Sequence, residues 1–193
     1  MTVEFETLRE ANLVRQAEWD KAGGIDLAYR GNEMAGEIGE VFEVAYSLID
    51  QMARFAEDLT DLRSQLADEL ADAEICIDLI AMSEDLPAVE AQLDVRPEHQ
   101  GRYSLLDKAM IAMALGAGAG QACNIIKKLA RERLGIRGSR ASKADLSAAL
   151  SKALHAAHLL AWVEGIDLDA AVRRKFNATS AKVGLQTRMK VAA

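Results

Sequence analysis

Residues 66–81 read LADELADAEICIDLIA, and the periodicity of this stretch decides the fold class. Its apolar residues recur at intervals of three and four, and acidic residues fall between them. Such spacing places apolar side chains on one face of a helix with about 3.6 residues per turn. Residues 31–43, GNEMAGEIGEVFE, repeat the pattern with Met34, Ile38 and Val41. The two stretches predict a pair of amphipathic helices.

Helical patterns of this kind extend over most of the chain. Half of the 193 residues are hydrophobic, and only two are proline, so an all-α protein with a substantial core is expected. Residues 85–102 contain both prolines and predict a short helical piece and a linker. Asp167 is the predicted N-cap of a short last helix, and the chain from residue 178 is expected to be extended. The other expected helices cover residues 6–21, 30–54, 61–83, 105–133 and 143–164.

The net charge of −7 argues against general nucleic-acid binding, which depends on basic surfaces. It is compatible with an acidic pocket that holds cations. No signal peptide is evident, and no apolar run approaches the roughly 20 residues of a membrane span. We therefore expect a cytoplasmic protein with no membrane partner. Cys76 and Cys123 lie in apolar helical patterns and are expected to be buried free thiols.

Acidic residues are spaced one turn apart on two of the expected helices. Glu37 and Glu40 lie on the second helix, and Glu69 and Asp72 lie on the third. Carboxylates from two packed helices can converge on Mg²⁺, which prefers oxygen ligands. On spacing alone, a solvated acidic face is the more usual explanation of such charges. Two glycines, at residues 36 and 39, cost the helix about 0.5–1 kcal/mol each, which close helix packing or close ligand approach would explain.

The motifs Glu37-x-x-Glu40 and Glu69-x-x-Asp72 resemble the signature of the MazG-like all-α nucleoside triphosphate pyrophosphohydrolases. This superfamily includes dimeric dUTPases and phosphoribosyl-ATP pyrophosphatases. The flanking residues resemble the family in glycine placement and apolar pattern. The resemblance implies a helical bundle in which the four acids bind Mg²⁺, or alternatively Mn²⁺, and hydrolyse a nucleoside triphosphate to a monophosphate and pyrophosphate.

The second half of the chain is similar to the first at an offset of 80 or 81 residues. It resembles the same family without the acids, because Gly118, Gln121, Ala149 and Lys152 stand at the ligand positions. The expected organisation is a fused pseudo-dimer of two related four-helix-type units. Residues 1–86 form the unit with the metal site, 87–102 a linker, and 103–193 the degenerate unit. Two similar amphipathic helices of an ordinary bundle are the alternative.

Residues 175–188, KFNATSAKVGLQTR, resemble the C-terminal signature of phage-type members. This resemblance implies that Lys175, Asn177 and Arg188 bind substrate from the second half while the first half holds the metal. Families of this kind form homodimers, so the fused chain is also expected to act alone or to pair as a homodimer. The rival interpretation is a catalytically inactive nucleotide sensor or helical interaction protein.

Two other features have simpler interpretations. Trp19 and Trp162 are expected in the core rather than as platforms for base stacking. A basic cluster around residues 131–143 could meet phosphate oxygens, but a solvated helix end and loop is the favoured interpretation.

Overall fold

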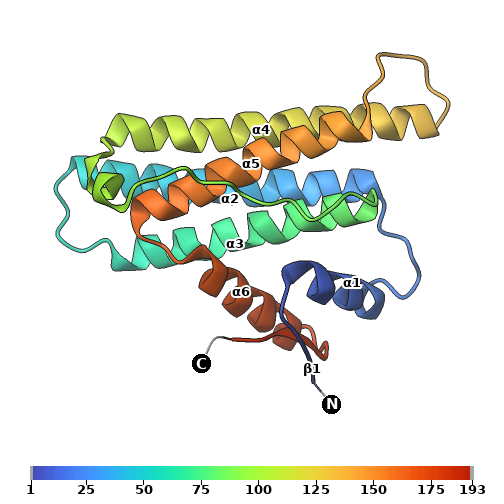
Figure 1. Ribbon diagram of the computed structural model, residues 1–193, viewed down its shortest axis with the longest axis horizontal. Helices are drawn as coiled ribbons and strands as arrows, with labels where there is room; N and C mark the ends of the chain where they lie inside the picture. The colour runs from blue at the N-terminus through green and yellow to red at the C-terminus, as the bar shows by residue number, and fades with distance from the viewer. Residues whose placement is uncertain (1, 192–193) are drawn as a thin grey trace.

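The computed structural model describes residues 2–191 and confirms the all-α character of the chain (Figure 1). Two three-residue strands, which the sequence analysis did not predict, lie near the chain ends. The elements in order are β1 (Val3–Phe5), α1 (Leu8–Trp19), α2 (Leu27–Ala53), α3 (Thr60–Ser83), η1 (Pro97–Arg102), α4 (Leu105–Arg133), α5 (Lys143–Glu164), α6 (Leu168–Lys182) and β2 (Thr187–Met189).

Helix starts follow the local capping chemistry. The hydroxyls of Thr7, Ser104 and Ser142 each accept a backbone N–H three residues on, and each belongs to a reciprocal capping box. Asp167 caps α6 as predicted, since its carboxylate accepts the N–H of Ala170. These side chains satisfy donors that the first helical turn leaves without partners.

The four long helices pack lengthwise around one hydrophobic core (Figure 1). α2 packs against α3, α4 packs against α5, and α2 also packs along α4. The fully buried side chains of Met34, Leu70, Leu115 and Leu150 come one from each of these helices. Burial of this shared core therefore holds the two helical hairpins together.

α4 and α5 approach closely at Gly118. A Cβ atom on Gly118 would lie 2.7 Å from the backbone nitrogen of Ala153. Gly36 and Gly39 of α2 differ, because a Cβ on either would have no neighbour within 4 Å. Close helix packing therefore does not explain these two glycines.

The chain ends meet on the far side of α3. α1 and α6 both pack against α3, and β1 pairs in parallel with β2, with Val3 opposite Thr187 (Figure 1). α6 continues to Lys182, so the prediction of extended chain from residue 178 is wrong by one helical turn. The register is helical there because Val172, Phe176 and Ser180 face the core at intervals of four residues.

Residues 85–96 run as an extended strap beside α5 before η1 (Figure 1). The backbone oxygen of Gln92 lies 3.1 Å from Nδ1 of His155, and the Gln100 amide donates to the Trp162 carbonyl. Of the helices described, α4 is long and apolar enough to cross a membrane by length and composition. No such segment was expected from the sequence. α4 packs along α2 and α5, and core helices meet the same criterion.

Candidate metal centre

The acidic residues lie on the faces of α2 and α3 that border the packed side of each helix. On α2, Met34, Ile38 and Val41 enter the core, and Glu37 and Glu40 lie one turn apart beside them. On α3, Leu66 and Leu70 enter the core, and Glu69 and Asp72 lie one turn apart beside them. Because α2 and α3 pack side by side, the two acidic pairs face a shared space.

Three of the predicted ligands converge. One carboxylate oxygen from each of Glu37, Glu40 and Glu69 lies within 4.8 Å of the others. Glu37 and Glu69 are half-buried, while Glu40 is exposed. The set offers only oxygen atoms, which suits a hard divalent cation such as Mg²⁺ better than a softer metal.

The fourth predicted ligand, Asp72, is joined to a lysine from the second half of the chain. Lys175 Nζ of α6 lies 2.7 Å from Asp72 Oδ2. Burial opposes the charge of Lys175, but the hydrogen bond to Asp72 and the nearby acids outweigh it and raise the pKa of the lysine. The ammonium group therefore supplies part of the positive charge at the centre.

Burial, with some repulsion between neighbouring acids, disfavours the ionised forms of these carboxylates. Burial raises the pKa of Glu37 to about 7, and repulsion from Asp72, Glu40 and Glu69 adds to the effect. Burial also raises the pKa of Glu69 and of Asp72. Lys175 lowers all three values but does not cancel the increase. The centre thus has more negative charge than its protein neighbours compensate, which is the condition that a bound cation relieves.

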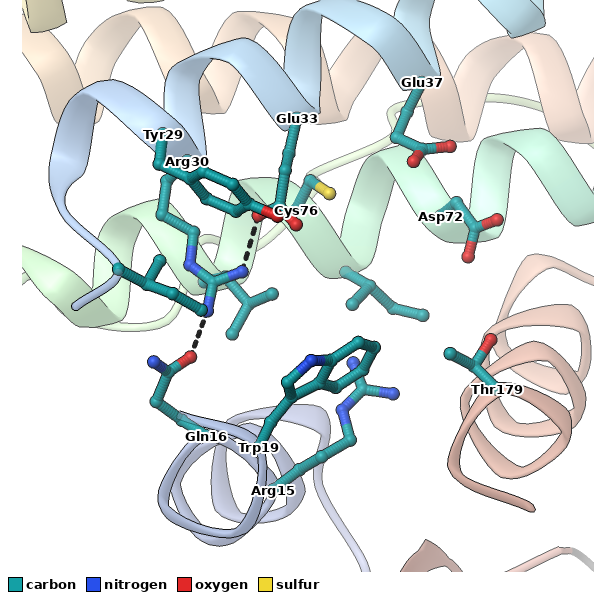
Figure 2. A pocket seen from close by; sticks show the side chains of 13 residues that line it. Arg15, Gln16, Trp19, Tyr29, Arg30, Glu33, Glu37, Asp72, Cys76 and Thr179 are labelled. Carbon is teal, nitrogen blue, oxygen red and sulfur yellow. Dashed lines mark hydrogen bonds and ion pairs between the residues drawn. The ribbon is translucent and has the colours of Figure 1, made fainter. Parts of the chain in front are cut away.

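A cavity of about 120 Å³ adjoins the carboxylates between α1, α2, α3 and α6 (Figure 2). Glu37 and Asp72 lie at its edge, and Trp19 and Arg15 reach it from α1 (Figure 2). Trp19 is 49% exposed, so its predicted core position is wrong. It is exposed because it is the last residue of α1, beyond the part of that helix that packs on α3. The lining residues are Arg15, Gln16, Trp19, Ile25, Tyr29, Arg30, Glu33, Glu37, Asp72, Ile75, Cys76, Leu79 and Thr179.

Arg15 is the most unusual side chain of the cavity. It is 4% exposed, its guanidinium carbon lies 3.6 Å from the centre of the Phe176 ring, and its Nη1 atom has no hydrogen-bond partner within residues 2–191. Burial lowers its pKa to about 10, although the charge of Asp72 acts in the opposite direction. A buried donor without a partner is costly, so Arg15 is available to an oxygen atom of a ligand.

Arg30 forms a second polar group in the cavity. Its Nη1 lies 2.5 Å from Glu33 Oε2, and its Nη2 donates to the side-chain oxygen of Gln16 (Figure 2). Neither Arg15 nor Arg30 was predicted as a site residue from the sequence. Both occupy core-facing positions of otherwise amphipathic helices, and a charged residue at such a position was the available signal.

Two predicted substrate residues, Asn177 and Arg188, form hydrogen bonds with the C-terminal segment. The Asn177 amide donates to the Met189 carbonyl at 2.8 Å and accepts the Met189 N–H at 2.7 Å. Arg188 donates to the carbonyl oxygens of Leu185 and Thr187. In the part of the chain described, neither side chain contacts the four carboxylates. The two Asn177 hydrogen bonds hold β2 against α6, whereas those of Arg188 stay within residues 185–188.

The corresponding positions of α4 and α5 have no acids. Lys152 Nζ lies 3.4 Å from Gln121 Oε1, while Gly118 and Ala149 are buried. The close contact at Gly118 leaves no room for a longer side chain between these helices. Only the α2–α3 hairpin therefore has the geometry of a carboxylate centre among the residues described.

Comparisons with protein-family models, with curated proteins and with solved structures give no significant match to this chain.

Proposed function

We propose that this protein is a Mg²⁺-dependent pyrophosphohydrolase that converts a nucleoside or deoxynucleoside triphosphate to the monophosphate and pyrophosphate. The convergence of Glu37, Glu40 and Glu69 from two helices supports this proposal most directly. In the reaction, the oxygen of water bonds to the α-phosphorus, and the bond from that phosphorus to the α–β bridging oxygen breaks. Pyrophosphate leaves with that oxygen, and the water proton passes to solvent or a carboxylate.

The metal ligands in this proposal are Glu37, Glu40, Glu69 and Asp72, with Mn²⁺ as an alternative ion. A bound divalent cation supplies charge neutralisation at phosphate and activation of water. The raised pKa values of Glu37, Glu69 and Asp72 support a cation here, because the protein alone compensates their charge poorly. Asp72 would exchange its contact with Lys175 for the metal, which frees the lysine for a phosphate oxygen.

The adjoining cavity is the proposed nucleotide pocket. Arg15 has a buried donor without a partner, which suits a phosphate or sugar oxygen. The exposed ring of Trp19 offers an apolar face next to it. Of the residues predicted as substrate ligands, Asn177 would act indirectly, by holding the terminal strand against α6, and Arg188 would stabilise the turn before that strand.

The fused pseudo-dimer of two MazG-like units remains part of the proposal. Each half contributes one long hairpin, and Lys175 of the second half lies on the carboxylates of the first. A homodimer of the whole chain is also proposed, and light scattering tests it. Exposed apolar side chains on α2 and α4 support it: Phe42, Tyr46, Leu106, Met110 and Met113.

Pyrophosphate release from a panel of nucleoside and deoxynucleoside triphosphates tests the hydrolase. We expect Mg²⁺-dependent turnover that Glu40→Gln or Asp72→Asn reduces by roughly 100-fold or more. Glu43→Gln is the matched control, since Glu43 is an exposed acid on the same helix outside the cluster. Unchanged turnover in Glu40→Gln and Asp72→Asn would refute the assignment of the metal ligands.

A non-catalytic nucleotide sensor is the second candidate. The contact between Lys175 and Asp72 favours it, because a lysine retained there would leave three converging carboxylates. Nucleotide binding without pyrophosphate release across the whole panel would support the sensor over the hydrolase.

A further inference from the structure

The loop between α4 and α5 contains a second cavity, of about 350 Å³, which shares no lining residue with the cavity beside the carboxylates. Four cationic side chains line it, and Glu132 is its one carboxylate: the cations are Lys128, Arg131, Arg137 and Arg140. The whole chain carries a net charge of −7, so this cavity reverses the prevailing sign. A concentration of like charges around a hollow attracts an anion.

The start of the loop is anchored to the end of α4. Gly135 has φ +69°, a left-handed conformation that favours glycine. Its N–H donates to the Glu132 carbonyl at 3.0 Å, and the N–H of Ile136 donates to the Arg131 carbonyl at 3.0 Å. These bonds fold the loop back beside the last turn of the helix, next to its own basic residues.

Arg131 and Gly138 form the inner wall of the cavity. Arg131 Nη2 donates to the Ser139 carbonyl at 3.0 Å. A Cβ atom on Gly138 would lie 2.5 Å from that same Nη2 atom. The guanidinium group can therefore take this position only because residue 138 has no side chain.

Donors are left free around the cavity. Within residues 2–191, the backbone N–H groups of Arg137, Gly138 and Ser139 have no intramolecular hydrogen-bond partner. Arg140 is 84% exposed and has only a 3.4 Å contact with Glu132. The nearby cations Arg133 and Lys143 differ, because both pair with the buried carboxylate of Glu84. Of the four cations that line the cavity, Lys128 and Arg137 make no ion pair or side-chain hydrogen bond within residues 2–191, whereas Arg131 is held by Ser139.

We propose that this loop is a binding site for a small phosphate-bearing anion. Guanidinium groups and backbone N–H groups together are the donors that phosphate oxygens require. A small anion fits the enclosed dimensions, whereas a long nucleic acid would meet the acidic remainder of the surface. Anion binding at this loop is independent of hydrolysis at the carboxylate cluster.

Isothermal titration calorimetry of the full chain with pyrophosphate, in EDTA, tests the site. Without metal, the carboxylate cluster repels the anion, and the arginine variants below assign the remaining binding to the loop. We expect Arg137→Ala/Arg140→Ala to weaken pyrophosphate binding by roughly tenfold or more. The matched control is Arg96→Ala/Arg102→Ala, which removes the same charge from exposed residues outside the cavity. It should change the dissociation constant less than about twofold.

Gly138→Ala tests whether pyrophosphate binding depends on the position of Arg131 or only on the net positive charge of the loop. It leaves the charge unchanged but displaces Arg131, so we expect weaker pyrophosphate binding with an unaltered thermal unfolding transition. Equal losses in the two arginine double variants, an unchanged affinity in Gly138→Ala, or no binding by the unmodified chain would overturn the proposal. If a single-stranded oligonucleotide binds far more tightly and displaces pyrophosphate, the proposed ligand would be nucleic acid and not a small anion.

Discussion

Replacing Glu37 with glutamine should stabilise the metal-free protein. The carboxyl of Glu37 is half-buried among Glu40, Glu69 and Asp72, and its pKa rises from 4.5 to about 7. Glutamine keeps the shape of the side chain and its hydrogen-bonding capacity but cannot ionise. The variant therefore removes the electrostatic cost of the centre without opening a cavity.

The sign and the pH window follow from linkage. Below pH 4.5 the carboxyl of Glu37 is protonated in both the folded and the unfolded chain, so it costs nothing. Between pH 4.5 and 7 the unfolded chain ionises first and binds fewer protons, so the free energy of unfolding falls as pH rises. Above pH 7 the cost is constant. The change in pKa of about 2.5 units, converted in full at about 1.4 kcal/mol per unit, gives about 3.5 kcal/mol, and solvent screening of a half-exposed group reduces this to about 1–2 kcal/mol.

Urea denaturation at pH 5 and pH 8, in EDTA, measures this effect. We expect Glu37→Gln to raise the free energy of unfolding by about 1–2 kcal/mol at pH 8 and by much less at pH 5. Glu43→Gln, an exposed acid on the same helix, controls for net charge. Added Mg²⁺ should narrow the difference, because it stabilises the unmodified chain more than the variant. A variant less stable than the unmodified chain at pH 8, or an equal gain in the control, would refute this account.

Three further predictions rest on specific contacts. Gly118→Ala should lower the free energy of unfolding by about 1–3 kcal/mol, because its Cβ would lie 2.7 Å from a backbone nitrogen of α5. Gly120→Ala on the same helix has open space around its Cβ and should raise the free energy of unfolding by about 0.5–1 kcal/mol. Urea denaturation compares the two variants, and equal effects would contradict the close contact at Gly118. Asn177→Ala removes both hydrogen bonds to Met189, so amide exchange in β2 should become faster while exchange in α3 is unchanged; protection retained in β2 would refute the anchoring role. Lys175→Met should destabilise the metal-free chain by about 1 kcal/mol at pH 8, and by less at pH 3, where the partner Asp72 is protonated. Thermal unfolding measures both losses, and an equal loss at pH 8 and pH 3 would exclude an electrostatic cause.

Much of the fold was predictable because its signals are local. Helix periodicity and caps involve residues three or four apart, so α4 and α5 begin and end where the sequence analysis placed them. Glu37 and Glu40, and Glu69 and Asp72, likewise share a face through spacing alone. Glu37, Glu40 and Glu69 converge because α2 and α3 are neighbours. A short connection between two long helices favours that arrangement.

The rest depends on how distant segments pack. The sequence does not show that Lys175 lies on Asp72, because about a hundred residues separate them and α6 must first dock on α3. Nor does the sequence show the terminal strands, because three residues are too few for a periodic pattern. They form strands only through the pairing of Val3 with Thr187 and its neighbours. A tryptophan such as Trp19 can be buried or exposed, and the sequence does not distinguish the two. Its exposure follows from its position at the end of α1 in the folded chain. The sequence by itself determined the helices and the acidic pairs, whereas the tertiary structure alone decided which cations and which cavity those acids meet, because local spacing does not encode the docking of one helix on another.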